Sequence, residues 1–251
     1  MRKLVLLAAV VAIAVAIAAA RTADHWQELV VNGLHAAGDG DYIRAELLFN
    51  QAVHEAEAFG PTDPRLAATW NNLGVIYRRH GKSRPAEGAF RRASLIFGRI
   101  DASGMDAGNV ALNLGLVLMD EALFEAAEPH LQRALDIFQT RFGATSAKAA
   151  VAFFNLGEAF RHQKKFDSAE AMFKQASDII EANFGVASPD LAATLNSRAL
   201  NFAAQGDYRR AEPMFKLALS IWGASPGTHA AEKAATLNSY ETMLRQTGRI
   251  R

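Results

Sequence analysis

One dipeptide returns along the chain at nearly constant intervals, and this period limits the possible folds more than any other feature. An alanine followed by a glutamate recurs at intervals of 41, 41, 42 and 42 residues, with the alanines of this series at Ala45, Ala86, Ala127, Ala169 and Ala211. A fixed period of about 20–50 residues is typical of repeat architectures. We therefore expect stacked helical units, each contacting its neighbours, rather than one globular core.

Positions at fixed distances from this pair repeat their chemical character. A small residue lies twelve positions before the alanine, at Gly33, Gly74, Gly115, Gly157 and Ala199. A large apolar residue lies four positions after the alanine, at Phe49, Phe90, Leu131, Phe173 and Phe215. Each unit is predicted to be a helix–turn–helix, in which small residues such as Gly74 and Ala86 face each other and the aromatic residue fills the space beside them. A glycine such as Gly81 suits the turn, because it tolerates a left-handed backbone. Prolines at 85, 129 and 213 are expected near the start of the second helix, where a missing N–H costs little.

The second unit carries a recognisable motif. Its residues follow W-x2-L-G-x2-Y and then A-x3-F, at Trp70, Leu73, Gly74, Tyr77, Ala86 and Phe90. This pattern resembles the tetratricopeptide repeat (TPR). The longer period adds about two helical turns to each unit, and this form resembles the TPR arrays of kinesin light chains and their bacterial relatives. The matching segments are Thr69–Gly74, Thr194–Ser197, Thr236–Ser239 and Ala211–Pro213.

The resemblance covers about residues 26–248 and implies an all-α fold. We predict a right-handed α-solenoid of five TPR repeats within residues 21–251, preceded by an N-terminal hydrophobic helix. The repeats are expected at about 26–59, 67–100, 108–142, 150–184 and 192–222. A single helix at 230–248 is predicted to cap the array, because a solenoid needs its last apolar face covered.

The first twenty residues have the pattern of a targeting segment. Arg2 and Lys3 precede an apolar run of 17 residues, Leu4 to Ala20, and Ala18 and Ala20 form an A-x-A cleavage site. These are the three parts of a secretory signal peptide. The run would also span about 26 Å as a helix, close to the roughly 30 Å membrane core, so an uncleaved anchor is the alternative; a buried soluble helix is a third reading. The first two place the remaining chain across the membrane, which is the periplasm in a bacterium.

Composition and motifs argue against several classes of function. Without Arg2 and Lys3, 25 basic residues stand against 26 acidic ones, with no long run of one sign, so a nucleic-acid partner is not expected. The chain has no cysteine, which excludes disulfides and thiolate metal sites. No phosphate-binding loop or zinc-helix motif occurs, and no two histidines are three or four residues apart. We therefore expect no enzyme activity, no cofactor and no metal site.

Asparagines mark the expected inner face of the solenoid, which the first helices of TPR pairs form. Asn72, Asn113 and Asn155 occupy one column, and Asn196 and Asn238 sit one residue earlier in their repeats, as Asn71 does in the second. An amide both donates and accepts hydrogen bonds and can therefore hold the backbone of an extended peptide. The resemblance to peptide-binding TPR grooves assigns this role to Asn72, Asn113 and Asn155. The alternative is that the amides join neighbouring first helices and fix the twist.

Three arginines add positive charge to the same face. Arg78, Arg79 and Arg161 would favour an acidic or C-terminal peptide, because a guanidinium pairs well with a carboxylate; the alternative is that they only solvate helix ends. The leading hypothesis is an exported or membrane-tethered TPR scaffold that binds a protein or peptide in its groove. A structural subunit of an envelope complex, which would use its ends or convex face, is the second. A glycan- or small-ligand-binding solenoid, or a remote enzyme, is the third.

Overall fold

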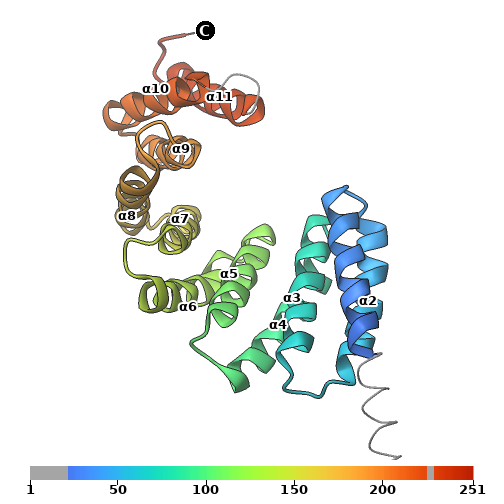
Figure 1. Cartoon of the computed structure of the whole chain (residues 1–251). Helices are drawn as coiled ribbons and strands as arrows, with labels where there is room; N and C mark the ends of the chain where they lie inside the picture. The colour runs from blue at the N-terminus through green and yellow to red at the C-terminus, as the bar shows by residue number, and fades with distance from the viewer. Residues whose placement is uncertain (1–21, 225–228, 251) are drawn as a thin grey trace, which may run out of the picture. The chain divides into compact units, whose positions relative to one another are not determined.

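The computed structural model describes residues 22–224 and 229–250 (Figure 1). The predicted N-terminal hydrophobic helix and its cleavage site, within residues 1–20, lie outside this part of the chain. Within it, the regular secondary structure is entirely helical. A first helical stretch covers residues 22–38. Ten further helices follow, α2 (Tyr42–Glu57), α3 (Pro64–Arg79), α4 (Ser83–Ile100), α5 (Met105–Asp120), α6 (Phe124–Phe142), α7 (Ala147–His162), α8 (Phe166–Phe184), α9 (Pro189–Ala204), α10 (Tyr208–Ala224) and α11 (Ala230–Gln246).

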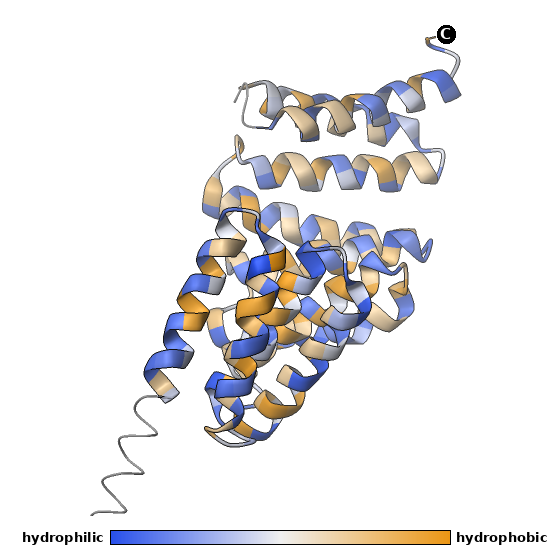
Figure 2. Cartoon of the chain, turned by 90° about the vertical axis from the view of Figure 1, so that its right-hand side faces the viewer, coloured by the Kyte–Doolittle hydropathy of each residue, from blue (hydrophilic) through white to orange (hydrophobic). Residues whose placement is uncertain are grey.

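These helices form two compact units that divide between Glu121 and Ala122. In the first unit α3 packs on α4, and α2 and α5 pack on that pair; in the second, α7 packs on α8 and α9 on α10. First helices of successive repeats also touch, α3 with α5 in the first unit, and α7 with α9 and α9 with α11 in the second. Figure 2 shows apolar and polar residues alternating along single helices, as expected where one stripe of each helix is buried.

The turns between paired helices use the left-handed region whether or not a glycine is present. Gly40, Gly81 and Gly206 have φ of 78°, 74° and 76°, as their column predicts. Ala122 and Lys164 occupy the equivalent positions with φ of 59° and 60°. A side chain in this region is uncommon, so the surrounding helix pair, rather than the residue type, fixes this turn.

Proline is further inside two helices than the sequence predicted. Pro85 is the third residue of α4, but Pro129 and Pro213 are each the sixth residue of their helices, α6 and α10. At that position proline removes an internal hydrogen bond. The expectation of a start position is wrong for these two because each lies two residues after the repeated alanine, whereas Pro85 lies one residue before it and all three helices begin three residues before that alanine.

The core follows the predicted columns, with one change in geometry. Phe49, Phe90, Leu131, Phe173 and Phe215 are all fully buried. A Cβ atom added at Gly74 would lie 2.6 Å from the ring of Phe90, and one at Gly157 would lie 2.6 Å from the ring of Phe173. The aromatic ring therefore packs directly onto the glycine rather than beside it.

Helix α11 closes the second unit. Met243 is 1% exposed and belongs to one apolar cluster with Phe215 and Phe202. The ring of Tyr240 packs against that of Phe215 with centroids 5.7 Å apart. The outward side of α11 carries the exposed residues Glu232, Lys233 and Arg245. The helix thus covers the last repeat as a cap does.

Candidate functional site

In the second unit, three first helices surround a hollow of about 330 Å³, here called the C-terminal hollow. Its walls combine amide, hydroxyl and guanidinium groups with apolar side chains. Its lining residues are Arg161 of α7, Leu200, Ala203 and Ala204 of α9, and Asn238, Ser239, Thr242, Met243 and Gln246 of α11. The structure therefore brings together two residues that the sequence analysis selected, Arg161 and Asn238.

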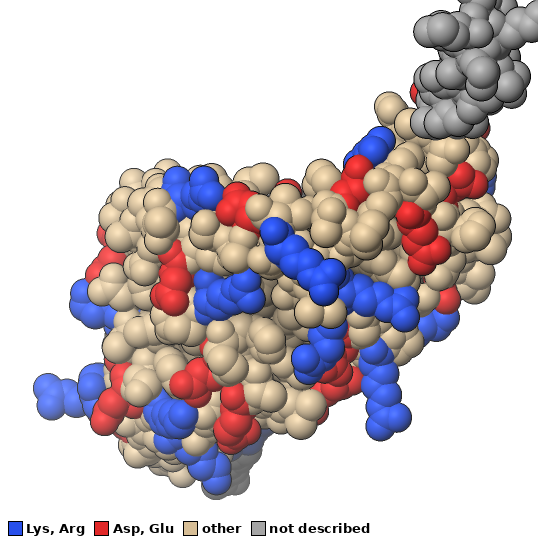
Figure 3. Space-filling model, turned by 90° about the horizontal axis from the view of Figure 1, so that it is seen from below, with Lys and Arg blue, Asp and Glu red and all other residues tan. Residues whose placement is uncertain are grey.

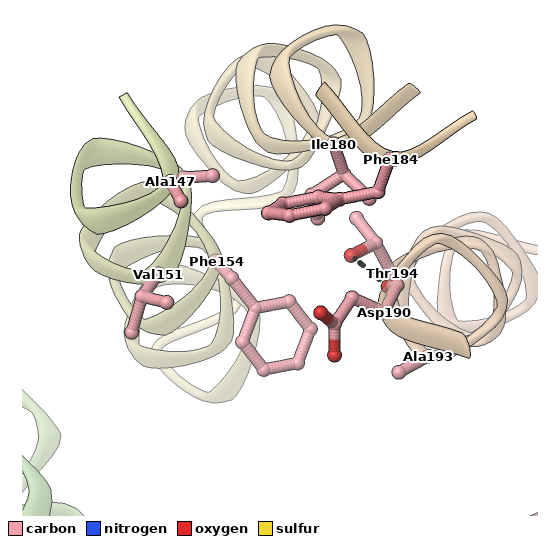
Figure 4. Close-up of a pocket in the computed structure, with 9 residues that line it drawn as sticks. Ala147, Val151, Phe154, Ile180, Phe184, Asp190, Ala193 and Thr194 are labelled. Atoms are coloured by element: carbon pink, nitrogen blue, oxygen red, sulfur yellow. Dashed lines mark hydrogen bonds between the residues drawn. The ribbon is translucent and has the colours of Figure 1, made fainter. Parts of the chain in front are cut away.

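A second hollow of about 190 Å³, here called the Asp190 pocket, lies between α7, α8 and α9 (Figure 4). It is lined by Ala147, Ala150, Val151 and Phe154 of α7, Ile180 and Phe184 of α8, and Asp190, Ala193 and Thr194 of α9. Residues seven apart lie on one helical face. Phe154 and Arg161 of α7, and Ala193 and Leu200 of α9, are related in this way. The two hollows therefore follow one another along the same faces of α7 and α9.

In the first unit, two of the predicted asparagines bind each other instead of facing an open groove. The Nδ2 of Asn113 in α5 donates to the Oδ1 of Asn71 in α3 over 2.9 Å. The Nε1 of Trp26 likewise donates to the Oγ1 of Thr69 in α3 over 2.9 Å. Both bonds join first helices of successive repeats. Asn71 and Asn113 therefore have the alternative role, in which their amides connect neighbouring first helices.

The other asparagines differ in their surroundings. Asn155 donates to the carbonyl of Val151 in its own helix over 2.8 Å. Asn72 is half-buried and makes no hydrogen bond with the described residues. The Oδ1 of Asn196 is buried and has no partner there, and it lies on α9 between the positions that line the two hollows. Asn238 is exposed in the C-terminal hollow.

Two of the three predicted arginines already pair with carboxylates of the same chain. Arg78 donates to both carboxylate oxygens of Asp120, over 2.5 and 3.2 Å. Arg161 donates to Glu158 over 2.7 Å. Arg79 is exposed and has no ion pair with the described residues. The positive charge available to a ligand on this face is thus smaller than the sequence indicates.

His162 lies next to Arg161 at the end of α7. Its ring stacks on that of Phe124 with centroids 4.4 Å apart. Burial, and then the charge of Arg161, hold the pKa of His162 below its usual value, although Glu158 opposes the shift. A neutral imidazole at neutral pH leaves Glu158 to balance Arg161 alone.

The repeated glutamate has a structural role that was not predicted from the sequence. In three repeats, the glutamate accepts a hydrogen bond from a basic residue of the following repeat. The donors are Lys82 to Glu46 at 2.7 Å, Lys165 to Glu128 at 3.0 Å, and Arg198 to Glu170 at 2.5 Å. Figure 3 shows basic and acidic side chains close together over the face in view. The recurrence of glutamate at this position is the signal in the sequence that indicates such a role.

Glu212, the fifth member of this column, binds the end of the chain. It accepts hydrogen bonds from Arg249 and from the hydroxyl of Tyr240, and its partner Lys216 is 2.7 Å away. The hydrogen bonds from Arg249, Lys216 and Tyr240 lower the pKa of Glu212 to about 2. The glutamate column therefore joins each of these repeats to the element after it.

Residues 22–224 and 229–250 contain no group of three histidine, aspartate or glutamate side chains placed to hold a metal ion. Within the same part of the chain, no helix combines the length and apolar character needed to cross a membrane.

The fold and the repeated helix pairs define an all-helical solenoid of the kind used as a binding scaffold. Family models described as tetratricopeptide repeat match residues 29–96, 106–182 and 191–224, which together exceed half of the chain. The chain therefore belongs to the TPR family, as the sequence motif predicted. A comparison with curated protein sequences finds no match.

Solved structures share this fold. BtubC (BKLC) from P. vanneervenii is 24% identical, with a TM-score of 0.71 over 85% of this chain and 91% of that chain. A Rap protein complexed with Competence and Sporulation Factor is 18% identical, with a TM-score of 0.63 over 78% and 54%. YrrB, a TPR protein with an unusual peptide-binding site, is 18% identical, with a TM-score of 0.54 over 82% and 90%. At these identities the similarity establishes the fold.

Proposed function

We propose that this chain is a TPR scaffold that binds a protein through an extended peptide segment in the groove formed by α7, α9 and α11. The C-terminal hollow is the observation that carries the proposal. Its volume of about 330 Å³ reaches the lower end of the roughly 300–1,000 Å³ usual for ligand sites. Leu200 and Met243 offer apolar contact, and the amides of Asn238 and Gln246 offer donors and acceptors for a peptide backbone.

Two solved structures of this fold support a binding function, and one of them, YrrB, supports a peptide as the ligand. The Rap protein is complexed with Competence and Sporulation Factor, and YrrB has a peptide-binding site. The walls of the hollow carry binding groups but no cluster of titrating groups of the kind that an active site uses. Binding, rather than catalysis, is the function that this surface supports.

A display library of random peptides would supply ligands for a direct test. Ala204 lies in the hollow and is exposed, so Ala204→Arg fills the groove without burying the new side chain. Selected peptides should bind this variant at least about tenfold more weakly, a loss of about 1.4 kcal/mol. Ala171→Arg is the control, because Ala171 is exposed on α8 and lines neither hollow. If both variants bind the selected peptides equally, the groove is not the binding site.

The location of the protein belongs to the same proposal. We propose, from Arg2, Lys3 and the apolar run of residues 4–20, that this segment carries the chain into or across a membrane, so that the repeats lie outside the cytoplasm. Sequencing the N-terminus of the mature protein separates cleavage after Ala20 from an uncleaved anchor. Recovery of the full-length chain in the soluble cytoplasmic fraction would contradict both.

In the first unit, the predicted preference for an acidic or C-terminal peptide rests on Arg79 of α3, which does not line the C-terminal hollow, because Arg78 and Arg161 already have carboxylate partners. Unchanged peptide affinity and salt dependence in Arg79→Ala would remove this preference.

One observation favours the second candidate, a structural subunit of an envelope complex. Ile43 and Leu47 of α2 are 74% and 59% exposed, and they line a shallow hollow beside His80 and Lys82. Large apolar side chains on an outer face mark interaction surfaces in many proteins. Ile43→Ser with Leu47→Ser should then release the chain from its native complex while leaving peptide binding intact.

A further inference from the structure

The Asp190 pocket is built on three sides from elements with different chemistry. Ala147, Ala150, Val151 and Phe154 occupy one face of α7 at the spacing of successive turns, and Ile180 and Phe184 close the pocket from the end of α8. The side of α9 contributes Asp190. Figure 4 shows the ring of Phe154 and the carboxylate of Asp190 directed into the same space. The pocket is therefore an apolar recess with one acidic wall.

The size and exposure of the pocket indicate that a single side chain would fill it. Its volume is about 190 Å³, below the roughly 300 Å³ at which pockets for whole small molecules begin. Phe184 and Val151 remain 55% and 48% exposed. Covering these apolar side chains would remove apolar surface from water, which favours binding by about 25 cal/mol per Å².

The charge of Asp190 limits which kind of ligand side chain the pocket would accept. Its carboxylate is exposed and makes no hydrogen bond or ion pair with the described residues. The hydroxyl of Thr194 donates to the backbone carbonyl of Asp190 over 2.8 Å and so does not serve the carboxylate. Lys148, a basic residue near the pocket in sequence, lies over the rings of Phe138 and Phe142. The pocket thus offers one carboxylate without a cation.

We propose that the Asp190 pocket receives a lysine or arginine side chain of the bound peptide. The aliphatic stem of such a side chain lies against Phe154, Val151 and Phe184 while its head group pairs with Asp190. Arginine is preferred, because its planar guanidinium both stacks on an aromatic ring and binds a carboxylate through two hydrogen bonds. The inference rests on the proposed function, since this pocket continues the faces of α7 and α9 that line the C-terminal hollow.

Capped pentapeptides, acetyl-Ala-Ala-Xaa-Ala-Ala-amide with arginine, lysine, norleucine or glutamate at Xaa, are suitable probes. Methyl NMR of Ile180 and Val151 reports on the walls of the pocket directly. The arginine and lysine peptides should shift these methyl signals in a saturable way. The norleucine peptide, which has an uncharged side chain of similar length, should bind about fivefold more weakly, the upper range for an exposed ion pair.

Asp190→Asn removes the charge and keeps the size of the side chain. It should weaken the arginine peptide about fivefold and leave the norleucine peptide unchanged. Asp167→Asn is the matched control, because Asp167 is the exposed second residue of α8 as Asp190 is of α9. Equal binding of norleucine and arginine, or no effect of Asp190→Asn, would overturn the inference.

The outcome can be separated from that of the proposed function. Library peptides that lose affinity in Ala204→Arg but not in Asp190→Asn would keep the groove and refute the basic side chain. The absence of any saturable shift at Ile180 and Val151 with the arginine peptide would refute the pocket itself.

Discussion

Replacing Gly74 by alanine tests how closely the paired helices approach. A Cβ atom at this position would lie 2.6 Å from Cε1 and 2.7 Å from Cδ1 of Phe90, which is fully buried. Forcing an extra methyl group into a packed core costs about 1–3 kcal/mol, whereas alanine in a helix interior is favoured over glycine by about 0.8–1 kcal/mol. The net effect of Gly74→Ala should therefore lie between about zero and 2 kcal/mol of destabilisation.

Gly88 provides a control in the same helix pair. It lies within α4, and no heavy atom comes within 4 Å of a Cβ atom added there. Gly88→Ala should stabilise the protein by the propensity term alone, about 0.8–1 kcal/mol. In urea unfolding of both variants, the difference between them isolates the crowding by Phe90 and should reach about 1–3 kcal/mol.

The fifth repeat shows that a helix pair can accommodate a methyl group at the position of Gly74, which would lower the destabilisation by Gly74→Ala. Ala199 takes the place of the glycine there, in the same apolar cluster as the fully buried Phe215. An alanine is thus compatible with the fold where the helix pair accommodates it, and a small shift of α3 against α4 would place the cost at the lower end. If Gly74→Ala stabilises the protein as much as Gly88→Ala does, Phe90 does not hold the helices at this distance.

Three further predictions concern the core, the glutamate column and the asparagine pair. Phe173→Ala should cost about 3–5 kcal/mol, because this side chain is fully buried; an unmoved Tm would contradict the packing. Since the pKa of Glu212 is lowered to about 2 from 4.5, its contribution to stability is present above about pH 4.5 and is lost as the pH falls toward 2, so Glu212→Gln should lose less Tm between pH 7 and pH 3 than the wild type does. A double-mutant cycle of Asn71→Ala and Asn113→Ala should give a coupling of about 0.5–1.5 kcal/mol, and additivity would mean that their hydrogen bond contributes nothing.

The sequence predicted the helix pairs and the core because those depend on features that repeat. The period, the glycine column and the column of buried large apolar residues are each visible in the sequence without knowledge of how neighbouring repeats pack. Turns such as that at Lys164 were less predictable, because the helix pair imposes a positive φ on a residue that does not favour it.

The binding surface was harder to predict, because it depends on contacts between different repeats. The sequence could not decide whether Asn113 faces a ligand or Asn71, since the answer depends on the distance between α3 and α5. It selected Arg161 and Asn238, which share a hollow, because helical spacing predicts a common face. It missed Phe184 in the Asp190 pocket, because this residue ends a helix outside the motif columns.

The pattern of the glutamate column changes near residue 121, where the chain divides into two compact units. Glu46 and Glu128 each bind a lysine in the turn of the following repeat, Lys82 and Lys165. The corresponding turn after α5 reads Glu121, Ala122, Leu123 and contains no basic residue. Glu87, the glutamate before it, instead pairs with Arg91 in its own helix over 2.6 Å.

This turn contains the boundary between the two compact units. In a solenoid, stability is the sum of repeat terms and neighbour terms. A single exposed ion pair contributes at most about 1 kcal/mol, so its loss alone does not separate two units. Because the helices before and after residue 121 form two compact units, hydrogen exchange should show them opening as two separate cooperative groups.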